Sequence, residues 1–283
     1  MVIRLMLASL CSVASASTYE PGQVVGQVDS ERLNEISGLV ASRRYPEVFW
    51  VHNDSGDNPY VYAINRQGKL LGTFQVSGAK AVDWEDIAWS PGETTDILYL
   101  ADIGDNTAQR QEITVYSIAE PNIALGQGAS VVMTEPATVR HYSYPDGPYD
   151  AETLLIDPVN RDLYIVTKRQ LYSRLYRAPL SGEKDGGKDL EFITVLPVGF
   201  VVGGDVATDG SAIVLRTLTQ AWVWQRSKNT SFKLCFSGPK QMVTLLSEPQ
   251  GEAICFSRKS YGIYTISEGR FPKLHFFSEF NPQ

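Results

Sequence analysis

The chain has 283 residues, 43% of them hydrophobic, and a formal net charge of −7 at pH 7. A single domain of this length can bury a large core. The acidic balance argues against nucleic acid or an anionic membrane surface as a partner, and it permits cationic ligands, above all metal ions.

The first residues have the pattern of a secretory signal peptide. Arg4 supplies a positive charge, residues 5–13 form a short apolar stretch, and Ala14-Ser15-Ala16 is a small-x-small cleavage site. We therefore expect residues 1–16 to be a signal peptide and residues 17–283 to form one domain. The protein is then exported, to the periplasm or the extracellular space, and no later apolar run is long enough to be a transmembrane segment.

The rest of the chain consists of short apolar runs, rich in Val, Ile, Tyr, Phe and Trp and separated by Gly, Pro, Asn and Asp. This pattern predicts many short strands and almost no helix. Five of the runs begin with an acidic residue, at intervals of 50, 67, 53 and 47 residues. They are residues 35–39, 85–89, 152–156, 205–208 and 252–256. Four strands in a unit of about 50 residues is the period of a β-propeller blade.

The two ends of the chain complement each other. The last unit ends one strand short, after Leu274-His275-Phe276-Phe277, whereas residues 24–28 form a strand that precedes the first unit. We therefore predict an all-β propeller that its N-terminal strand closes by completing the last blade. Five blades are expected, and six remain possible because the 67-residue unit could contain extra strands.

Two units share a second motif after their second strand. Asp54-Ser55-Gly56-Asp57-Asn58 and Asp102-Ile103-Gly104-Asp105-Asn106 both read D-x-G-D-N. We interpret both as tight turns in which glycine supplies a positive φ and Asp or Asn bonds to the local backbone.

These motifs, together with Asp83-Trp84-Glu85-Asp86-Ile87-Ala88 and Asp150-Ala151-Glu152, resemble those of a group of exported bacterial β-propeller proteins of no known activity. More loosely, the acid-then-strand pattern is similar to the SdiA-regulated, phytase-like and SMP-30-type propellers. That looser resemblance implies a divalent metal, often calcium, held by carboxylates at the central channel. Those families typically have six blades.

The propeller geometry brings the acidic positions together. The first strand of each blade lines the channel and the second strand returns to the same face, so the start of one and the end of the other lie near one mouth. Because carboxylates without cysteine favour a hard ion, we expect the metal ligands to be Glu35, Glu85, Glu152, Asp205, Glu252, Asp54 and Asp102. Alternatively, these acids bond backbone amides and hold adjacent blades together.

Basic residues occupy the same positions in the third and fourth units. Lys168 and Arg216 end the second strands there, and His52 lies near the same mouth. A phosphate or carboxylate could bridge these cations and a metal, so we expect all three residues to contact a small anionic ligand. In the alternative, Lys168 and Arg216 pair with Glu152 and Asp205 in their own blades.

The leading functional hypothesis is a monomeric propeller that binds Ca²⁺ and recognises a small anionic ligand or a protein partner at this mouth. Whether it is an enzyme stays open, because the sequence has no G-x-S-x-G elbow and no HExxH motif. The alternatives are a metal-dependent hydrolase of phosphoesters or lactones, a glycoside hydrolase and an interaction scaffold. Cys235 and Cys255 could form a disulfide or be two buried thiols.

Overall fold

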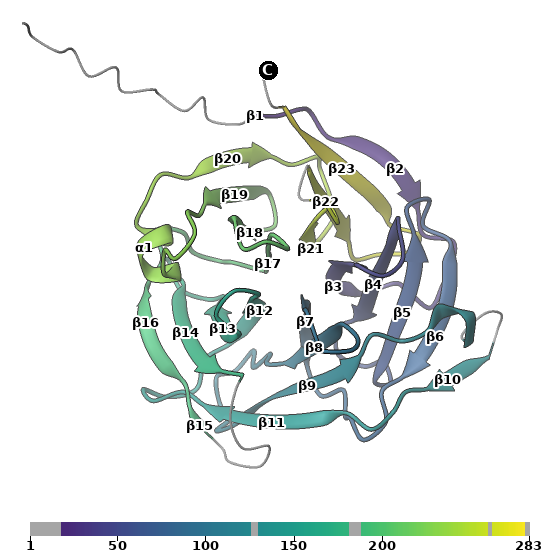
Figure 1. The fold of residues 1–283 in the computed structure, drawn as a ribbon, viewed down its shortest axis with the longest axis horizontal. Helices are drawn as coiled ribbons and strands as arrows, with labels where there is room; N and C mark the ends of the chain where they lie inside the picture. Colours follow the sequence, from purple (N-terminus) through teal and green to yellow (C-terminus); the bar gives the residue numbers. More distant parts are fainter. Residues whose placement is uncertain (1–17, 126–129, 181–187, 260–261, 281–283) are drawn as a thin grey trace, which may run out of the picture.

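The computed structural model describes residues 18–125, 130–180, 188–259 and 262–280. The predicted signal peptide lies outside these ranges. Five sheets of mainly antiparallel strands stand around one axis, so the structure is a five-bladed β-propeller, as the repeat predicts (Figure 1). Within the described ranges, no helix has the length and apolar character needed to cross a membrane.

Each blade begins with its innermost strand and proceeds outward. Blade 1 contains β3 (Ile36–Ala41), β4 (Val48–Asn53), β5 (Tyr60–Asn65) and β6 (Leu70–Gln75). Blade 2 contains β7 (Trp84–Ser90), β8 (Ile97–Asp102), β9 (Ile113–Ala119) and β11 (Thr138–Ser143). Blade 3 contains β12 (Ala151–Asp157), β13 (Asp162–Thr167), β14 (Arg174–Pro179) and β16 (Glu191–Val195). Blade 4 contains β17 (Gly203–Val206), β18 (Ala212–Arg216), β19 (Gln220–Gln225) and β20 (Gln241–Thr244).

Blade 5 is built from both ends of the chain. Its inner strands are β21 (Gly251–Phe256), β22 (Gly262–Ser267) and β23 (Lys273–Phe280). The N-terminal strands β1 (Thr18–Tyr19) and β2 (Gln23–Gln27) both pair antiparallel with β23, and Gln23 lies opposite Phe276. The predicted closure of the ring by the N-terminal strand is thus confirmed.

The long second unit contributes an edge strand to its neighbour and not a sixth blade. After η1 (Ile123–Leu125), the segment β10 (Val131–Met133) runs parallel to β6 at the outer edge of blade 1. In the same way β15 (Lys188–Asp189), from the third unit, runs parallel to β11 of blade 2. Covering an outer strand removes an exposed row of backbone groups that could pair with another chain.

The hydrophobic core is divided among the junctions between blades. Each of five buried clusters combines side chains from two adjacent blades. The cluster that joins blades 5 and 1 includes Leu39 and Tyr62 on one side and Ala253 and Leu274 on the other. Because every junction contains an apolar cluster, the ring is held together without a disulfide between its ends.

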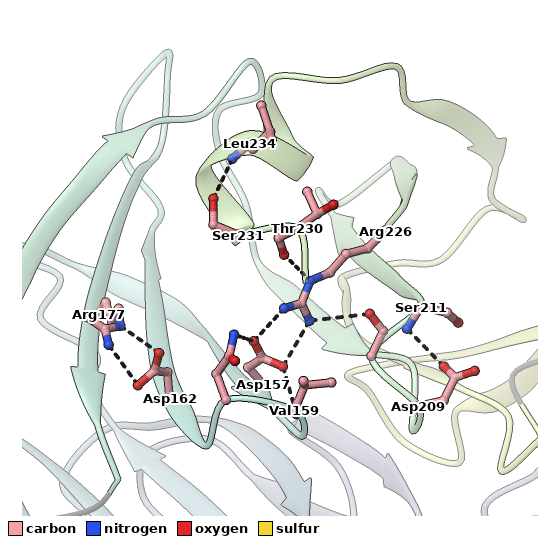
Figure 2. A network of polar contacts seen from close by, with 12 residues as sticks. Asp157, Val159, Asp162, Arg177, Asp209, Ser211, Arg226, Thr230, Ser231 and Leu234 are labelled. Carbon is pink, nitrogen blue, oxygen red and sulfur yellow. Dashed lines mark hydrogen bonds and ion pairs between the residues drawn. The ribbon is translucent and has the colours of Figure 1, made fainter. Parts of the chain in front are cut away.

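A buried ion pair reinforces the junction between blades 3 and 4 (Figure 2). Arg226, just after β19, donates from Nη1 and Nη2 to the two carboxylate oxygens of Asp157, at 2.9 and 2.8 Å. It also donates to the carbonyl oxygen of Thr230 and lies over the ring of Phe232. Every charge here has partners, so the network fixes the junction and leaves no free group for a ligand.

The two cysteines of the domain are free and buried, so they do not form a disulfide. Cys255 lies in β21, as the apolar run predicts, but Cys235 lies in the short helix α1 (Phe232–Phe236) and not in a strand. The hydroxyl of Ser231 caps this helix by accepting from the amide of Leu234. Capping and burial of Phe232, Cys235 and Phe236 make five residues helical where the apolar pattern alone suggests a strand.

Candidate functional site

The candidate site lies at the end of the channel where the innermost strands begin and the second strands end. In four blades the second residue of the innermost strand forms a β-bulge, because the ladder skips it. The bulged residues are Ser37, Glu85, Glu152 and Glu252. A bulge changes the direction of a side chain, and this one occurs at the same point of four strands.

The residue two positions before each bulged residue also lies at the mouth. Its backbone carbonyl accepts a hydrogen bond from a backbone amide just after the second strand of the same blade. The pairs, acceptor first, are Glu35 with Asp54, Asp83 with Gly104, Asp150 with Lys168 and Gln250 with Glu268. Glu35 is therefore equivalent to Asp83 and Asp150. The comparison of the repeat units had matched Glu35 to Glu85 and Glu152, and that match is wrong by two residues.

Blade 4 departs from this pattern. Its strand β17 has no bulge, and Asp205 lies deeper in the channel, opposite Val214. The carboxylate of Asp205 accepts from its neighbour Val206 and, at 2.8 Å, from the amide of Phe256 in blade 5. Asp86 makes the corresponding bond, at 2.9 Å, to the amide of Leu154. Both carboxylates connect adjacent blades, which is the alternative role considered for the acids.

Five carboxylates converge between blades 1, 2 and 3. The oxygens of Asp54, Asp83 and Glu85 lie within 4.8 Å of one another, and so do those of Glu85, Asp150 and Glu152. Glu85 belongs to both groups. We call these five residues the mouth carboxylates. Glu85, Asp150 and Glu152 are at most 4% exposed, so water compensates little for their mutual repulsion.

Burial and mutual repulsion raise the pKa values of Asp54, Asp83, Glu85 and Glu152. The pKa of Glu85 lies well above its ordinary value, first because of burial and then because of Glu152 and Asp54. Burial likewise raises the pKa of Glu152 to about 8 and that of Asp54 to about 6. The pKa of Asp83 is also raised, by burial and by Asp150. Burial and repulsion therefore make these four acids costly to ionise, whereas Asp150 is paired with Arg169 at 2.6 Å.

Lys168 neutralises one side of this cluster. Its Nζ contacts Oε1 of Glu152 and lies 3.9 Å from Oε1 of Glu252. Oε2 of Glu152 is buried and has no hydrogen-bond partner within the described ranges. Burial opposes the charge on Lys168, but Glu152 and Glu252 outweigh it and raise the pKa of the amine.

Two carboxylates lie together on the blade 5 side of the mouth. Glu268 forms a side-chain hydrogen bond with Glu252, and burial together with this bond raises the pKa of Glu268 to about 9. Glu35 is exposed at the outer rim of the same mouth. Glu252 and Glu35 thus border the mouth carboxylates without joining either close group.

Asp102 lies at the end of β8 but faces the loop that carries Asp83. Its carboxylate accepts from the amides of Val82 and Asp83 and forms a 2.8 Å ion pair with Arg110. It therefore holds Asp83 in position. Gly104, after β8, does not have a positive φ. A Cβ there would clash with the carboxylates of Glu85 and Asp83, so glycine makes room for them.

His52 is fully buried between blades 1 and 2. Its Nδ1 donates to the carbonyl oxygen of Asn53 at 2.8 Å, and its ring meets Trp84 edge-on. Burial lowers the pKa of His52 to about 4, so the imidazole is neutral at pH 7.

Arg216 is also fully buried. Its guanidinium donates to the carbonyl oxygens of Thr217 and Ala253 and forms a 2.7 Å ion pair with Glu248. It pairs with neither Asp205 nor the mouth carboxylates. Of the three residues expected to contact an anion, only Lys168 lies beside the mouth carboxylates, and the ligand roles of all three stay predictions.

Sequence reasoning missed Asp83 and Asp150 as candidate ligands. The signal was present, because Asp83-Trp84-Glu85 and Asp150-Ala151-Glu152 share the pattern D-x-E at the start of consecutive blades. In each doublet the aspartate directly precedes the innermost strand and the glutamate is its bulged second residue, so both lie at the mouth. A search for this doublet, instead of single acids, would have found four of the five mouth carboxylates.

No protein-family model matches the chain, and no curated protein matches it. Among solved structures, it is similar to the WD40 domain of Neurospora crassa Pan2, with 10% identity, a TM-score of 0.48 and coverage of 93% of this chain and 97% of that one. It is also similar to the β-propeller domain of Myceliophteria thermophila Cps50 (Swd1), with 10% identity, a TM-score of 0.47 and coverage of 91% and 99%. Likenesses this distant say nothing about function.

Proposed function

We propose that this propeller binds a divalent cation, with Ca²⁺ as the first candidate, between the mouth carboxylates. The observation that carries the proposal is the pair of three-carboxylate groups that share Glu85, each with its oxygens within 4.8 Å of one another. Neighbouring charges and burial make these groups costly to ionise alone, and a cation would remove that cost. The unpartnered Oε2 of Glu152 supplies an oxygen that a metal could satisfy.

Calcium suits this set of ligands better than a transition metal. The mouth carboxylates are all oxygen donors, and Ca²⁺ accepts six to eight oxygens at ~2.3–2.6 Å in irregular geometry. Mg²⁺ requires a nearly ideal octahedron at ~2.0–2.1 Å, which acids from three different blades are less suited to provide. We also propose that the protein is exported. Calcium-binding modules outside the cell function with dissociation constants of ~10⁻⁴–10⁻³ M, so even a weak calcium site would be occupied there.

We further propose that Lys168 and the bound cation together recognise a small anion. Lys168 lies on the Glu152 side of the cluster, next to Glu252. An anion bound there would contact the metal on one side and an ammonium on the other, and both interactions would be charge-assisted.

The direct test is calorimetric titration of Ca²⁺ and Mg²⁺ into protein freed of metal with EDTA. We expect one Ca²⁺ site, weaker Mg²⁺ binding, and a loss of about tenfold or more in Ca²⁺ affinity in Glu85→Gln, since a charged ligand contributes ~1.5–3 kcal/mol. The matched control is Glu120→Gln. Glu120 is a buried glutamate that accepts from Ser42 and Trp50 and is not one of the mouth carboxylates.

Absence of Ca²⁺ and Mg²⁺ binding, or equal affinity in wild type and Glu85→Gln, would refute the metal site. The anion is tested next, by titrating inorganic phosphate into the Ca²⁺-loaded protein below the point of precipitation. Binding that Lys168→Met abolishes supports the second step, and binding that this variant leaves unchanged contradicts it.

A further inference from the structure

A cavity lies at the junction of blades 5 and 1, on the face of the propeller opposite the mouth carboxylates. It occupies about 610 Å³ where β3 and β21 end and where β4 begins. Small-molecule sites typically measure ~300–1,000 Å³ and lie at junctions of this kind. It shares no residue with the mouth carboxylates, which lie where β3 and β21 begin.

One wall of this cavity is aromatic. The rings of Phe49, Tyr264 and Phe276 line it, with centroids 4.6 Å apart from Phe49 to Tyr264 and 4.6 Å apart from Tyr264 to Phe276. Phe49 and Tyr264 are nearly buried and belong to the core cluster that closes the ring. The wall is therefore rigid, and its rings, tilted by 59° and 37° against one another, offer an apolar surface to an aromatic ligand.

The rim of the cavity is basic. Arg66, Arg258 and Lys259 line it, and Glu47 is the one acid among its lining residues. The guanidinium of Arg66 lies 5.6 Å from the ring centroid of Phe276, and its side chain is 33% exposed. Its Nε is buried and has no hydrogen-bond partner within the described ranges.

The acid weakens this rim only in part. The carboxylate of Glu47 lies 3.8 Å from Arg66, but the Glu47 side chain is 63% exposed. An exposed pair at that distance is weak, of the order of 0–1 kcal/mol. Three cations with one poorly bound acid leave the rim positive, although the whole chain is acidic.

We propose that this cavity binds a small aromatic anion. The aromatic body packs against Tyr264 and Phe276, and a carboxylate, sulfonate or phosphate group accepts from Arg66 and Arg258. A guanidinium pairs with such groups through two parallel hydrogen bonds. Both features are needed, because the basic rim selects charge and the aromatic wall selects a flat ring.

The test uses two aromatic anions in EDTA, so that its outcome does not depend on the metal site. 8-Anilinonaphthalene-1-sulfonate is followed by fluorescence, and phenyl phosphate by calorimetry and by competition with the dye. We expect one saturable site shared by both probes. Inorganic phosphate should compete at least about tenfold more weakly than phenyl phosphate, because it lacks the ring.

Three variants test the role of charge. Arg66→Gln should weaken phenyl phosphate binding by about tenfold or more, whereas Glu47→Gln should strengthen it a few-fold by removing the competing acid. Lys228→Gln is the control, since Lys228 is an exposed cation in blade 4 and should bind as wild type. Melting curves confirm that each variant is folded.

Three outcomes would overturn the proposal. They are the absence of saturable binding by either probe, equal competition by inorganic phosphate and phenyl phosphate, and an unchanged affinity in Arg66→Gln. A weaker affinity in Glu47→Gln would also contradict it, because the proposal gives these two substitutions opposite signs.

Discussion

Without metal, the free energy of unfolding should fall as the pH rises from about 5 to about 9, and Ca²⁺ should cancel the part of that fall that the mouth carboxylates contribute. Folding raises the pKa values of Asp54 and Glu152 to about 6 and about 8. Between the unfolded and folded pKa values, the folded state keeps protons that the unfolded state has released. Stability is therefore full below the unfolded pKa values and is lost as the pH passes the folded ones.

The size of the effect follows from the shifts. One pKa unit corresponds to about 1.4 kcal/mol. Only the part of the Asp54 shift between about pH 5 and its folded pKa of about 6 falls in this range, which sets an upper limit of about 1.4 kcal/mol. Because Asp54 is partly exposed, solvent screening reduces this to about 0.5–1 kcal/mol. For Glu152, whose pKa rises from 4.5 to about 8, we count about 2–3 kcal/mol, roughly half of what the shift implies, because part of the shift is repulsion shared with Glu85. At about 2–4 °C per kcal/mol, the melting temperature should fall by about 5–16 °C.

The decisive variant is Glu85→Gln, measured by thermal unfolding in EDTA and in Ca²⁺ across this pH range. The neutral amide cannot ionise, so the metal-free variant should melt above wild type at about pH 8 and near it at about pH 5. The same variant should lose most of the Ca²⁺ response, which for wild type at a hundred times the dissociation constant is about 2.7 kcal/mol.

This pattern separates a binding site from a structural role. If Glu85 only held the blades together, the substitution would lower the melting temperature at every pH. A metal-free melting temperature that is flat or rises between about pH 5 and 9, or a Glu85→Gln variant less stable than wild type throughout, would refute the reasoning.

Three further predictions concern the frame around the site. Deleting residues 18–29 should expose the edge of β23 and cause aggregation or a large drop in melting temperature, and a truncated protein that melts like the intact domain would contradict closure. Arg226→Met leaves the charge of Asp157 buried and should cost about 3–5 kcal/mol in denaturant unfolding, whereas the exposed Lys228→Met should cost under about 0.5 kcal/mol. Gly104→Ala should weaken Ca²⁺ binding in calorimetry because its Cβ displaces Glu85, whereas Gly56→Ala, at a φ of 90° in open space, should cost about 1–2 kcal/mol and leave binding unchanged.

The fold could be predicted because its signals are local. Short apolar runs, their spacing and the missing strand of the last unit determine the blade count and the closure, and each can be counted along the chain. The extra residues of the second unit were ambiguous for a physical reason. Whether β10 starts a new blade or covers the edge of β6 depends on a tertiary contact that no local pattern encodes.

The candidate site could be predicted only in outline. The mouth and three of its carboxylates, Asp54, Glu85 and Glu152, follow from the repeat, but the bulges that set the register do not. A bulge inserts one residue and reverses the alternation of side chains, so single acids spaced by 50 residues were matched across different positions. Arg216 shows a second limit. Its place at the end of β18 resembles that of Lys168, yet it is fully buried on Glu248.

Blade 4 determines the shape of the whole site. Its innermost strand begins Gly203-Gly204 without a bulge, and a Cβ on Gly203 would clash with the backbone carbonyl of Glu252. Blade 4 can therefore place no acid at the level of Glu85 and Glu152, and the ring of carboxylates is open there. Three blades supply the close groups, and Lys168 separates them from Glu252. A site for a cation alone would gain nothing from a lysine at that position, because the two charges repel. An anion that contacts both the cation and the Lys168 ammonium would be attracted to each and would offset their repulsion. The phosphate titration with Lys168→Met therefore tests the role of the lysine.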